Sequence, residues 1–411
     1  MREILTFGTI VLVVAGGFAF ALLTSKLTER FPVPAPALFL LAAAVASDLF
    51  PHLTDHVSVR NVERIAVVAL IVILFDGGFG IGLRRFRVAA LPIVSLGLLG
   101  TFATAGLVAV FAHAAFGFAW TTAGILGAAL APTDPAVMFS VLGRREIGGR
   151  TGTILEGESG ANDPVGIALM IGMVELATHD DGSFWIVVRE FSLEMVVGLA
   201  LGVAGGIAMT KLLQNMSLPS EGLHTIRTLA GAGVVYGVAA VAHGSGFLAV
   251  FVAGLIVGDA RMPLRAQLEV FHDALSSLAE IVVFVALGVT ISLGGLPASH
   301  WLEGLAFAAF IALVARPVVV GALLLPARLR PGERLFVIWG GLKGAVPILL
   351  AAFALLAGVD GAQRIYDIVF VVVALSVLVQ GSTIPFAAAR LGVPMRSVRP
   401  PGEPSEAGRS R

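Results

Sequence analysis

Two aspartates in this sequence are each followed by a proline inside a long apolar stretch. Asp134 lies in the segment GAALAPTDPAVMF, and Asp163 lies in the segment ILEGESGANDPVGIALM. Because proline lacks an N–H group and disfavours helical geometry in the residue before it, the run 131–135 is expected to unwind. Unwound backbone leaves carbonyl oxygens free, and in an apolar environment these persist only where they line a cavity. The sequence therefore predicts a polar cavity beside Asp134.

Oxygen atoms dominate the chemistry available around Asp163. Ser159 lies four residues before it, so the two side chains share one face of a helix, and Glu158 and Asn162 share the neighbouring face by the same spacing. Two carboxylates, a hydroxyl, an amide and the carbonyls near Thr133 form an all-oxygen set, which suits a hard monovalent cation. The predicted ligands of Na⁺ or K⁺ are Asp163, Ser159, Glu158 and Thr133, and no resident cofactor is expected.

Two basic residues, Arg316 and Lys343, also fall inside apolar stretches. Lys343 lies in the run GGLKGAVP at 340–347, whose glycines and proline predict a second interruption of a helix. A charge buried in lipid needs a partner, and Glu158 and Glu280 are the candidate counter-ions. The sequence leaves open which acid pairs with which base.

The elements that position these residues are expected to be membrane helices. The 411-residue chain is 57% hydrophobic and 13% charged, with a mean hydropathy of +0.95, whereas soluble globular chains carry about 25% charged residues. It contains no cysteine, which excludes disulfides, thiolate nucleophiles and Cys-ligated metals. A window of about 20 apolar residues predicts thirteen spans. They are 4–23, 34–50, 62–82, 88–116, 119–142, 152–177, 190–210, 225–243, 246–259, 271–292, 301–325, 334–356 and 365–389.

Basic residues are distributed unequally between alternate loops. Of the 27 Lys and Arg residues, 20 fall in loops on one side, five fall on the other side and two lie within spans. By the positive-inside rule the richer side is cytoplasmic, which places the N-terminus outside and the C-terminus in the cytoplasm. The formal net charge of zero gives no reason to expect a nucleic-acid partner.

The two interrupted helices are the fifth and the twelfth predicted spans. An offset of seven, an odd number, means that they cross the membrane in opposite directions. Inverted repeats with two discontinuous helices that cross at the midplane are the general plan of secondary transporters. We therefore predict an all-α polytopic membrane protein of about 13 transmembrane helices over residues 1–399, with a disordered cytoplasmic tail at 400–411.

Several motifs resemble those of the NhaP/NHE-type monovalent cation:proton antiporters, and they follow the family's order over nearly the whole chain. They are PTDPAV, GESGANDPVGI, GFLAVFVAGLIVGD, SLAEIVVFVALGV, VARPVVV and GGLKGAVPI. The last motif resembles the bacterial branch associated with potassium/proton exchange. The resemblance implies a homodimer in a bacterial inner membrane, in which a transport core of spans 4–6 and 11–13 moves against a dimerisation unit of spans 1–3 and 7–10.

Carried over residue by residue, the resemblance implies that Asp163 is the carboxylate that binds the cation or the proton. It also implies that Arg316 pairs with Glu158, and Lys343 stands where many relatives have arginine. The groups that would complete or support the site are Ser159, Glu158, Asn162 and the backbone around Thr133 and Asp134.

A single carboxylate facing a cavity can hold a proton or a cation but not both, so competition alone couples the two fluxes. Asn162, beside Asp163, is neutral, so one proton should exchange for one cation without net movement of charge. The sequence therefore predicts an electroneutral antiporter, which is not an enzyme and whose partners are monovalent cations, protons and the lipid bilayer. The resemblance implies that it works by an elevator-like alternating-access mechanism.

Two other classes of membrane protein were weighed against this prediction. An intramembrane aspartyl protease also uses two aspartates on separate spans, and Tyr366–Asp367 resembles one of its motifs, but its Gly-x-Gly-Asp motif is missing. A cation channel needs repeated acceptors along a continuous path, whereas the polar residues here concentrate at one depth. Both classes fit the sequence less well than an antiporter.

Overall fold

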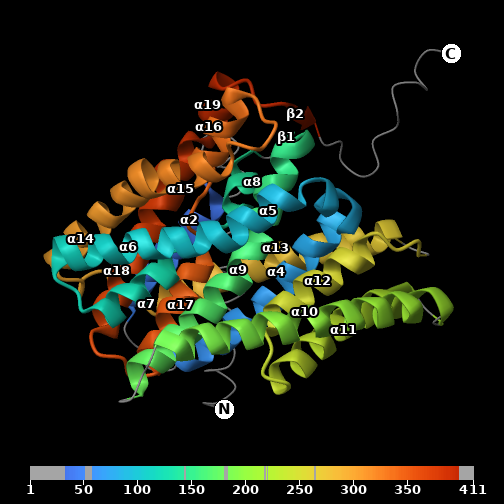
Figure 1. The fold of residues 1–411 in the computed structure, drawn as a ribbon, viewed down its shortest axis with the longest axis horizontal. Helices are drawn as coiled ribbons and strands as arrows, with labels where there is room; N and C mark the ends of the chain where they lie inside the picture. The colour runs from blue at the N-terminus through green and yellow to red at the C-terminus, as the bar shows by residue number, and fades with distance from the viewer. Residues whose placement is uncertain are drawn as a thin grey trace.

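The described part of the protein is a bundle of helices (Figure 1). A computed structural model describes residues 33–50, 58–142, 145–179, 184–216, 219, 221–262 and 265–397. The predicted span at 4–23 and the predicted tail at 400–411 lie outside these residues.

The helices follow the predicted spans from 34–50 onward. In the first half of the chain they are α2 (Ala35–Leu49), α4 (Val59–Val88), α5 (Ala90–Val94), η1 (Ser95–Gly100), α6 (Thr101–Phe116), α7 (Trp120–Leu130), α8 (Ala136–Leu142), α9 (Gly149–Thr178) and α10 (Phe184–Asn215). In the second half they are α11 (Glu221–Val241), α12 (Gly246–Gly258), α13 (Arg265–Val289), α14 (Ala298–Phe310), η2 (Ile311–Ala315), α15 (Arg316–Leu323), α16 (Pro331–Trp339), α17 (Ala345–Leu356), α18 (Ala362–Leu375), η3 (Ser376–Gly381) and α19 (Ser382–Arg390).

The lengths and composition of these helices agree with a multi-pass membrane protein. Among the described residues, six continuous helical segments are long and apolar enough to cross a membrane. They are Val59–Val88, Ala90–Phe116, Phe184–Asn215, Arg265–Val289, Ala298–Leu323 and Ala362–Arg390. The predicted all-helical class is therefore confirmed in outline.

One small β-sheet departs from the predicted class. Strand β1 (Arg145–Ile147) pairs antiparallel with strand β2 (Met395–Ser397), and the Gly148 N–H extends the pairing by donating to the Pro394 carbonyl at 2.8 Å. These strands are too short and too polar to show in a hydropathy pattern. They join the segment that leads into α9 to the segment that follows α19, at the end of the molecule where Figure 1 also places α16.

Two pairs of short helices are separated by non-helical residues. Helix α7 ends at Leu130 and α8 begins at Ala136; helix α16 ends at Trp339 and α17 begins at Ala345. Prolines in the first gap and glycines in the second account for the loss of helical geometry. The Asp134 N–H donates to the Leu342 carbonyl at 2.8 Å, so the two non-helical segments are in direct contact.

Three segments of π-helix interrupt otherwise continuous helices. Segment η1 lies between α5 and α6, η2 ends immediately before Arg316, and η3 contains Ser376 and Gln380. A π-helical turn inserts one residue into the helical repeat, which re-aims the side chains that follow it. The turn at η2 therefore helps to set the direction of Arg316.

Candidate functional site

A cavity of about 400 Å³ runs into the bundle beside both non-helical segments. Its walls come mainly from α4, α8, α9, α13 and α17, and Phe251 of α12 also lines it. Arg85, Ile147 and Glu156 line it toward the side that the charge distribution predicts to be cytoplasmic. Asp273 of α13 also lines it and is exposed, and the polar residues that line it farther in are Asp134, Ser159, Asp163, Ser276 and Glu280.

Asp163 brings a carboxylate with an unused oxygen to this cavity. The residue is only 5% exposed, and its Oδ1 atom is buried without a hydrogen-bond partner. The next residue is Pro164, which has no N–H group, so the helix cannot satisfy the carbonyl oxygen of Gly160 in the usual way. Since Gly160 also lines the cavity, its carbonyl is a candidate second acceptor beside Asp163 Oδ1. A bound proton or cation would satisfy the unpartnered oxygen of Asp163.

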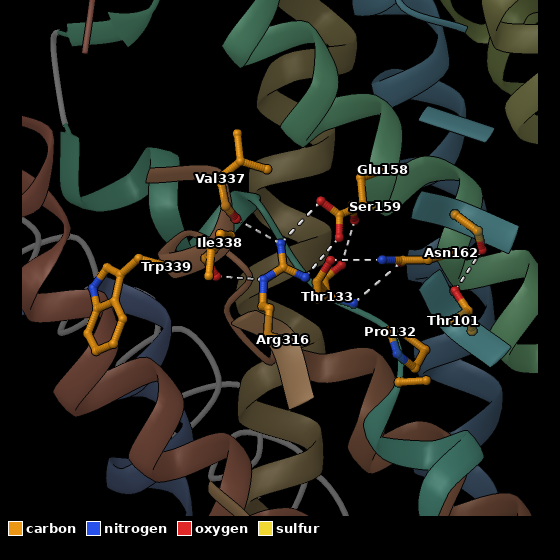
Figure 2. A network of polar contacts seen from close by, with 12 residues as sticks. Thr101, Pro132, Thr133, Glu158, Ser159, Asn162, Arg316, Val337, Ile338 and Trp339 are labelled. Atoms are coloured by element: carbon orange, nitrogen blue, oxygen red, sulfur yellow. Dashed lines mark hydrogen bonds and ion pairs between the residues drawn. The ribbon is translucent and has the colours of Figure 1, made fainter. Parts of the chain in front are cut away.

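Ser159 and Asn162 hold the first non-helical segment in place (Figure 2). The Ser159 hydroxyl donates to the Thr133 carbonyl at 2.7 Å. The Asn162 amide donates to Thr133 Oγ1 at 2.8 Å and accepts from the Thr133 N–H at 3.4 Å. Ser159 keeps its lone pairs and lines the cavity, whereas the amide of Asn162 is committed to Thr133.

Asp134 caps the helix that follows it. Its Oδ1 accepts from the Ala136 N–H at 2.9 Å at the start of α8, while the residue also lines the cavity. A Cβ atom on Gly344 would overlap the Asp134 carboxylate, so the second non-helical segment must carry a glycine here. The structure thus packs the two segments against each other at this aspartate.

Arg316 and Glu158 form a buried two-pronged ion pair, the pairing that the resemblance implies. Arg316 Nη1 lies 2.8 Å from Glu158 Oε1, and Nη2 lies 3.1 Å from Oε2. The guanidinium also donates to the carbonyls of Ile338 at 2.8 Å and Val337 at 3.0 Å, at the end of α16 (Figure 2). Both oxygens of Glu158 are therefore engaged, and Glu158 lies outside the set of residues that line the cavity.

Lys343 makes no ion pair with Glu280 in the described structure, although Glu280 was one of the two candidate counter-ions. Lys343 Nζ donates to the carbonyls of Ala131 and Pro132, each at 2.9 Å. These carbonyls are available because the segment at 131–135 is unwound, and an ammonium group satisfies them well. Among the described residues Lys343 has no ion pair within 4.0 Å, and Glu280 Oε1 is buried with no partner.

Several groups at the site were not predicted from the sequence. Ser376 Oγ accepts from the Lys343 N–H at 2.9 Å and donates to Gln380 Oε1 at 3.1 Å, so η3 supports the second non-helical segment. A serine and a glutamine four residues apart in an apolar run are a signal that could have identified this pair. Asp273 and Ser276 of α13 also line the cavity. The backbone carbonyls of Val337 and Ile338, which accept from Arg316, could not be identified from the sequence, because every residue has a backbone carbonyl.

The aspartate that resembled a protease motif lies in a different environment. Asp367 Oδ2 lies 2.8 Å from His300 Nδ1, and its Oδ1 accepts from Gln363 Nε2 at 2.8 Å. Asp367 lies outside the set of residues that line the cavity. It is therefore not arranged to face Asp163 as a second aspartate of a protease would.

The acids and bases of the described residues do not gather into a site for a divalent metal. No group of three or more His, Cys, Asp or Glu side chains in that part of the chain could hold a metal ion. The unpartnered carboxylate oxygen of Asp163, beside the Ser159 hydroxyl, instead matches the needs of a singly charged cation. The chemistry that this geometry permits is reversible binding of either a proton or such a cation.

Replacing Gly341 by alanine is expected to lower the melting temperature of the purified protein and its transport activity together. A Cβ atom at position 341 would overlap the Arg316 guanidinium, which cannot move because Glu158 and two carbonyls hold it. Gly321→Ala is the matched control, since its nearest neighbour would be Ile338 Cδ1 at 3.7 Å. Equal melting temperatures for the two variants in a thermal-unfolding experiment would contradict this packing.

Comparison with known proteins finds similar sequences over most of the chain. The family profile described as "Sodium/hydrogen exchanger, transmembrane" matches residues 11–390. The K(+)/H(+) antiporter NhaP2 of Shewanella sp. (strain ANA-3) is 34% identical over 379 residues, which cover 90% of this chain and 65% of that protein. The Na(+)/H(+) antiporter ApNhaP of Aphanothece halophytica is 27% identical over 346 residues, which cover 80% of this chain and 65% of that protein.

The fold is also that of a solved structure. The sodium proton antiporter MjNhaP1 from Methanocaldococcus jannaschii superposes with a TM-score of 0.79 and 22% sequence identity, over 95% of this chain and 99% of that one. The helical arrangement described above is therefore shared with this protein.

Proposed function

Because the chain belongs to the family of transmembrane sodium/hydrogen exchangers, we propose that it exchanges a monovalent cation for a proton across a membrane. The observation that carries the proposal is the buried, unpartnered Oδ1 of Asp163 at the wall of the cavity. Desolvating an unpaired carboxylate is costly, so the site is stable only when a proton or a cation occupies it. Asp163 would release one ligand only in exchange for the other.

The cation would be held by Asp163, by the Ser159 hydroxyl and by backbone carbonyls near Thr133 and Gly160. Each supplies oxygen, and one negative charge balances one positive charge. Glu158, which the sequence predicted as a ligand, is not one of the proposed ligands, because both of its oxygens contact Arg316. Glu158 and Arg316 instead compensate each other's charge and fix α9 to the end of α16.

The cavity at Asp163 would alternate between the two sides of the membrane by an elevator-like movement. Two pairs of broken helices, α7–α8 and α16–α17, support an inverted repeat with discontinuous helices that cross at the midplane. Segments η1 and η2 also support an inverted repeat. They lie in the fourth and the eleventh predicted spans, which are again seven spans apart. The proposed unit that moves comprises spans 4–6 and 11–13, and spans 1–3 and 7–10 would form the dimerisation unit of a homodimer.

The protein would lie in a bacterial inner membrane with its C-terminus in the cytoplasm. The transported ion would be Na⁺ or K⁺, since relatives named for each ion match the chain. A potassium-specific exchanger is the second candidate, supported by the 34% identity to a K(+)/H(+) antiporter.

Exchange is tested by reconstituting the purified full chain into liposomes with an imposed pH gradient. Addition of Na⁺, K⁺ or Li⁺ in separate experiments is expected to dissipate the gradient with at least one of these ions, at a rate that saturates with ion concentration. Protein-free liposomes provide the control. No dissipation with any of the three ions would contradict the proposed function.

Exchange is also expected to move no net charge. Asp163 is the only carboxylate of the proposed site that changes occupant, so one proton would leave for each cation that binds. Clamping the membrane potential at different values should therefore leave the exchange rate unchanged, within the error of a voltage-sensitive dye assay. A steady current that rises in proportion to exchange would show that a second proton or cation moves.

A further inference from the structure

Helix α13 presents three oxygen-bearing side chains along one face of the cavity. Asp273, Ser276 and Glu280 are spaced by three and four residues, which places them on the same side of the helix, and all three line the cavity. Asp273 is exposed, whereas Ser276 and Glu280 are partly buried. Val283 and Phe284, which line the cavity next along the helix, are buried. The face therefore leads from a solvated end into the interior.

Glu280 is the innermost carboxylate on this face, and nothing in the described protein engages its Oε1 atom. That atom is buried without a hydrogen-bond partner. The pairing with Lys343 that would have explained Glu280 does not exist, because Lys343 is bound to the carbonyls of Ala131 and Pro132. A carboxylate oxygen without a donor in such a position requires a partner that comes from solution.

The opposite wall of the cavity carries the candidate site itself. Asp134, at the start of α8, is close enough to Glu280 for the two carboxyl groups to interact electrostatically. Asp163 lines the same cavity, 5% exposed and with its own unpartnered oxygen. Asp76 of α4 is close enough to Asp273 for their carboxyl groups to interact electrostatically, and its side chain hydrogen-bonds with Ser276. Among the described residues that line the cavity, Arg85 is the basic one, and it lies 4.0 Å from Glu156.

We propose that Glu280 is a second cation-binding carboxylate, on the α13 wall, which holds the monovalent cation before the ion reaches Asp163. Asp273 and Ser276 guide the ion from the open end of the cavity to Glu280. This inference rests on the proposed function, since it assigns a further step to the same ion path. Glu280 binds the cation but takes no part in the exchange of occupants at Asp163, so its loss weakens cation capture without removing transport.

The test compares Glu280→Gln with Glu269→Gln in proteoliposomes. Glu269 lies on the same helix, is exposed and pairs with Arg265 at 2.8 Å, and it lies outside the set of residues that line the cavity. Glu280→Gln is expected to raise the KM for the cation about tenfold, the effect of losing a contact worth about 1.4 kcal/mol, with a maximal rate close to that of the wild type. Glu280→Asp keeps the carboxylate and should restore most of the affinity, and Glu269→Gln should behave as the wild type.

A second measurement separates binding from transport. In detergent, a cation that binds the folded state raises the melting temperature in proportion to its affinity. Adding K⁺ or Na⁺ should still stabilise Asp163→Asn weakly through Glu280, and this remaining stabilisation should vanish in the double variant Asp163→Asn/Glu280→Gln.

An unchanged KM in Glu280→Gln, with or without a loss of maximal rate, would overturn the assignment of Glu280. Equal stabilisation of Asp163→Asn and the double variant would also overturn it. If the proposed exchange function itself were wrong, the wild type would show no cation-dependent exchange. That result is distinguishable from failure of the Glu280 assignment alone.

Discussion

Replacing Asp163 by asparagine is expected to reduce cation–proton exchange to the rate of protein-free liposomes while the protein remains folded. Asparagine has nearly the same shape as aspartate, but it can neither bind a proton at neutral pH nor balance the charge of a cation. Because the substitution removes a buried carboxylate whose Oδ1 has no partner, the melting temperature should equal or exceed that of the wild type. The exchange rate and the thermal unfolding curve are measured on the same preparation.

Asp360→Asn is the control for this prediction. Asp360 is exposed in the turn before α18, so the same chemical change should leave both the exchange rate and the melting temperature unaltered. Substantial exchange by Asp163→Asn would exclude Asp163 as the residue whose occupant changes. A loss of folding in this variant would show instead that the carboxylate has a structural partner.

Breaking the ion pair between Arg316 and Glu158 is expected to have the largest effect on stability. Either Glu158→Gln or Arg316→Met leaves one charge buried without its counter-ion, which destabilises a folded protein by about 3–5 kcal/mol. The pair is less than a tenth exposed on both sides, so solvent cannot compensate. Each single variant should therefore yield little folded protein, as measured by monodispersity in gel filtration and by thermal unfolding.

The double variant Glu158→Gln/Arg316→Met tests whether the charges themselves are responsible. Removing both charges together should recover part of the stability lost in each single variant, so the two effects should be strongly non-additive. Recovery should be incomplete, because the carbonyls of Val337 and Ile338 also lose their donors. Additive losses would indicate that Arg316 and Glu158 stabilise the fold independently.

Hydropathy and proline positions were sufficient to predict most of the helical fold. Helices occur at each predicted span within the described residues, and the non-helical segments fall at 131–135 and 340–344, where proline and glycine predicted them. The β1–β2 pair escaped prediction because three-residue strands bury too little apolar surface to leave a pattern. The π-helical segments escaped it because their residues are ordinary helix formers.

Part of the candidate site was predictable from residue types and helical spacing. Ser159 and Asn162 both hydrogen-bond to Thr133, and Arg316 pairs with Glu158. The environment of Lys343 could not be predicted, because its partners are carbonyl oxygens that become available only when the helix unwinds. That result also left Glu280 unpaired, which changed its expected role from counter-ion to proposed cation ligand.

The claim that a proton and a cation compete for Asp163 is tested most directly by measuring the KM for the cation at several external pH values. The lumenal pH of the proteoliposomes is held constant while the external pH is varied between about 6 and 9. Competition predicts that the KM rises as the external pH falls, by up to about tenfold per pH unit, with an unchanged maximal rate. A KM that is independent of pH, with a maximal rate that changes instead, would contradict a shared site.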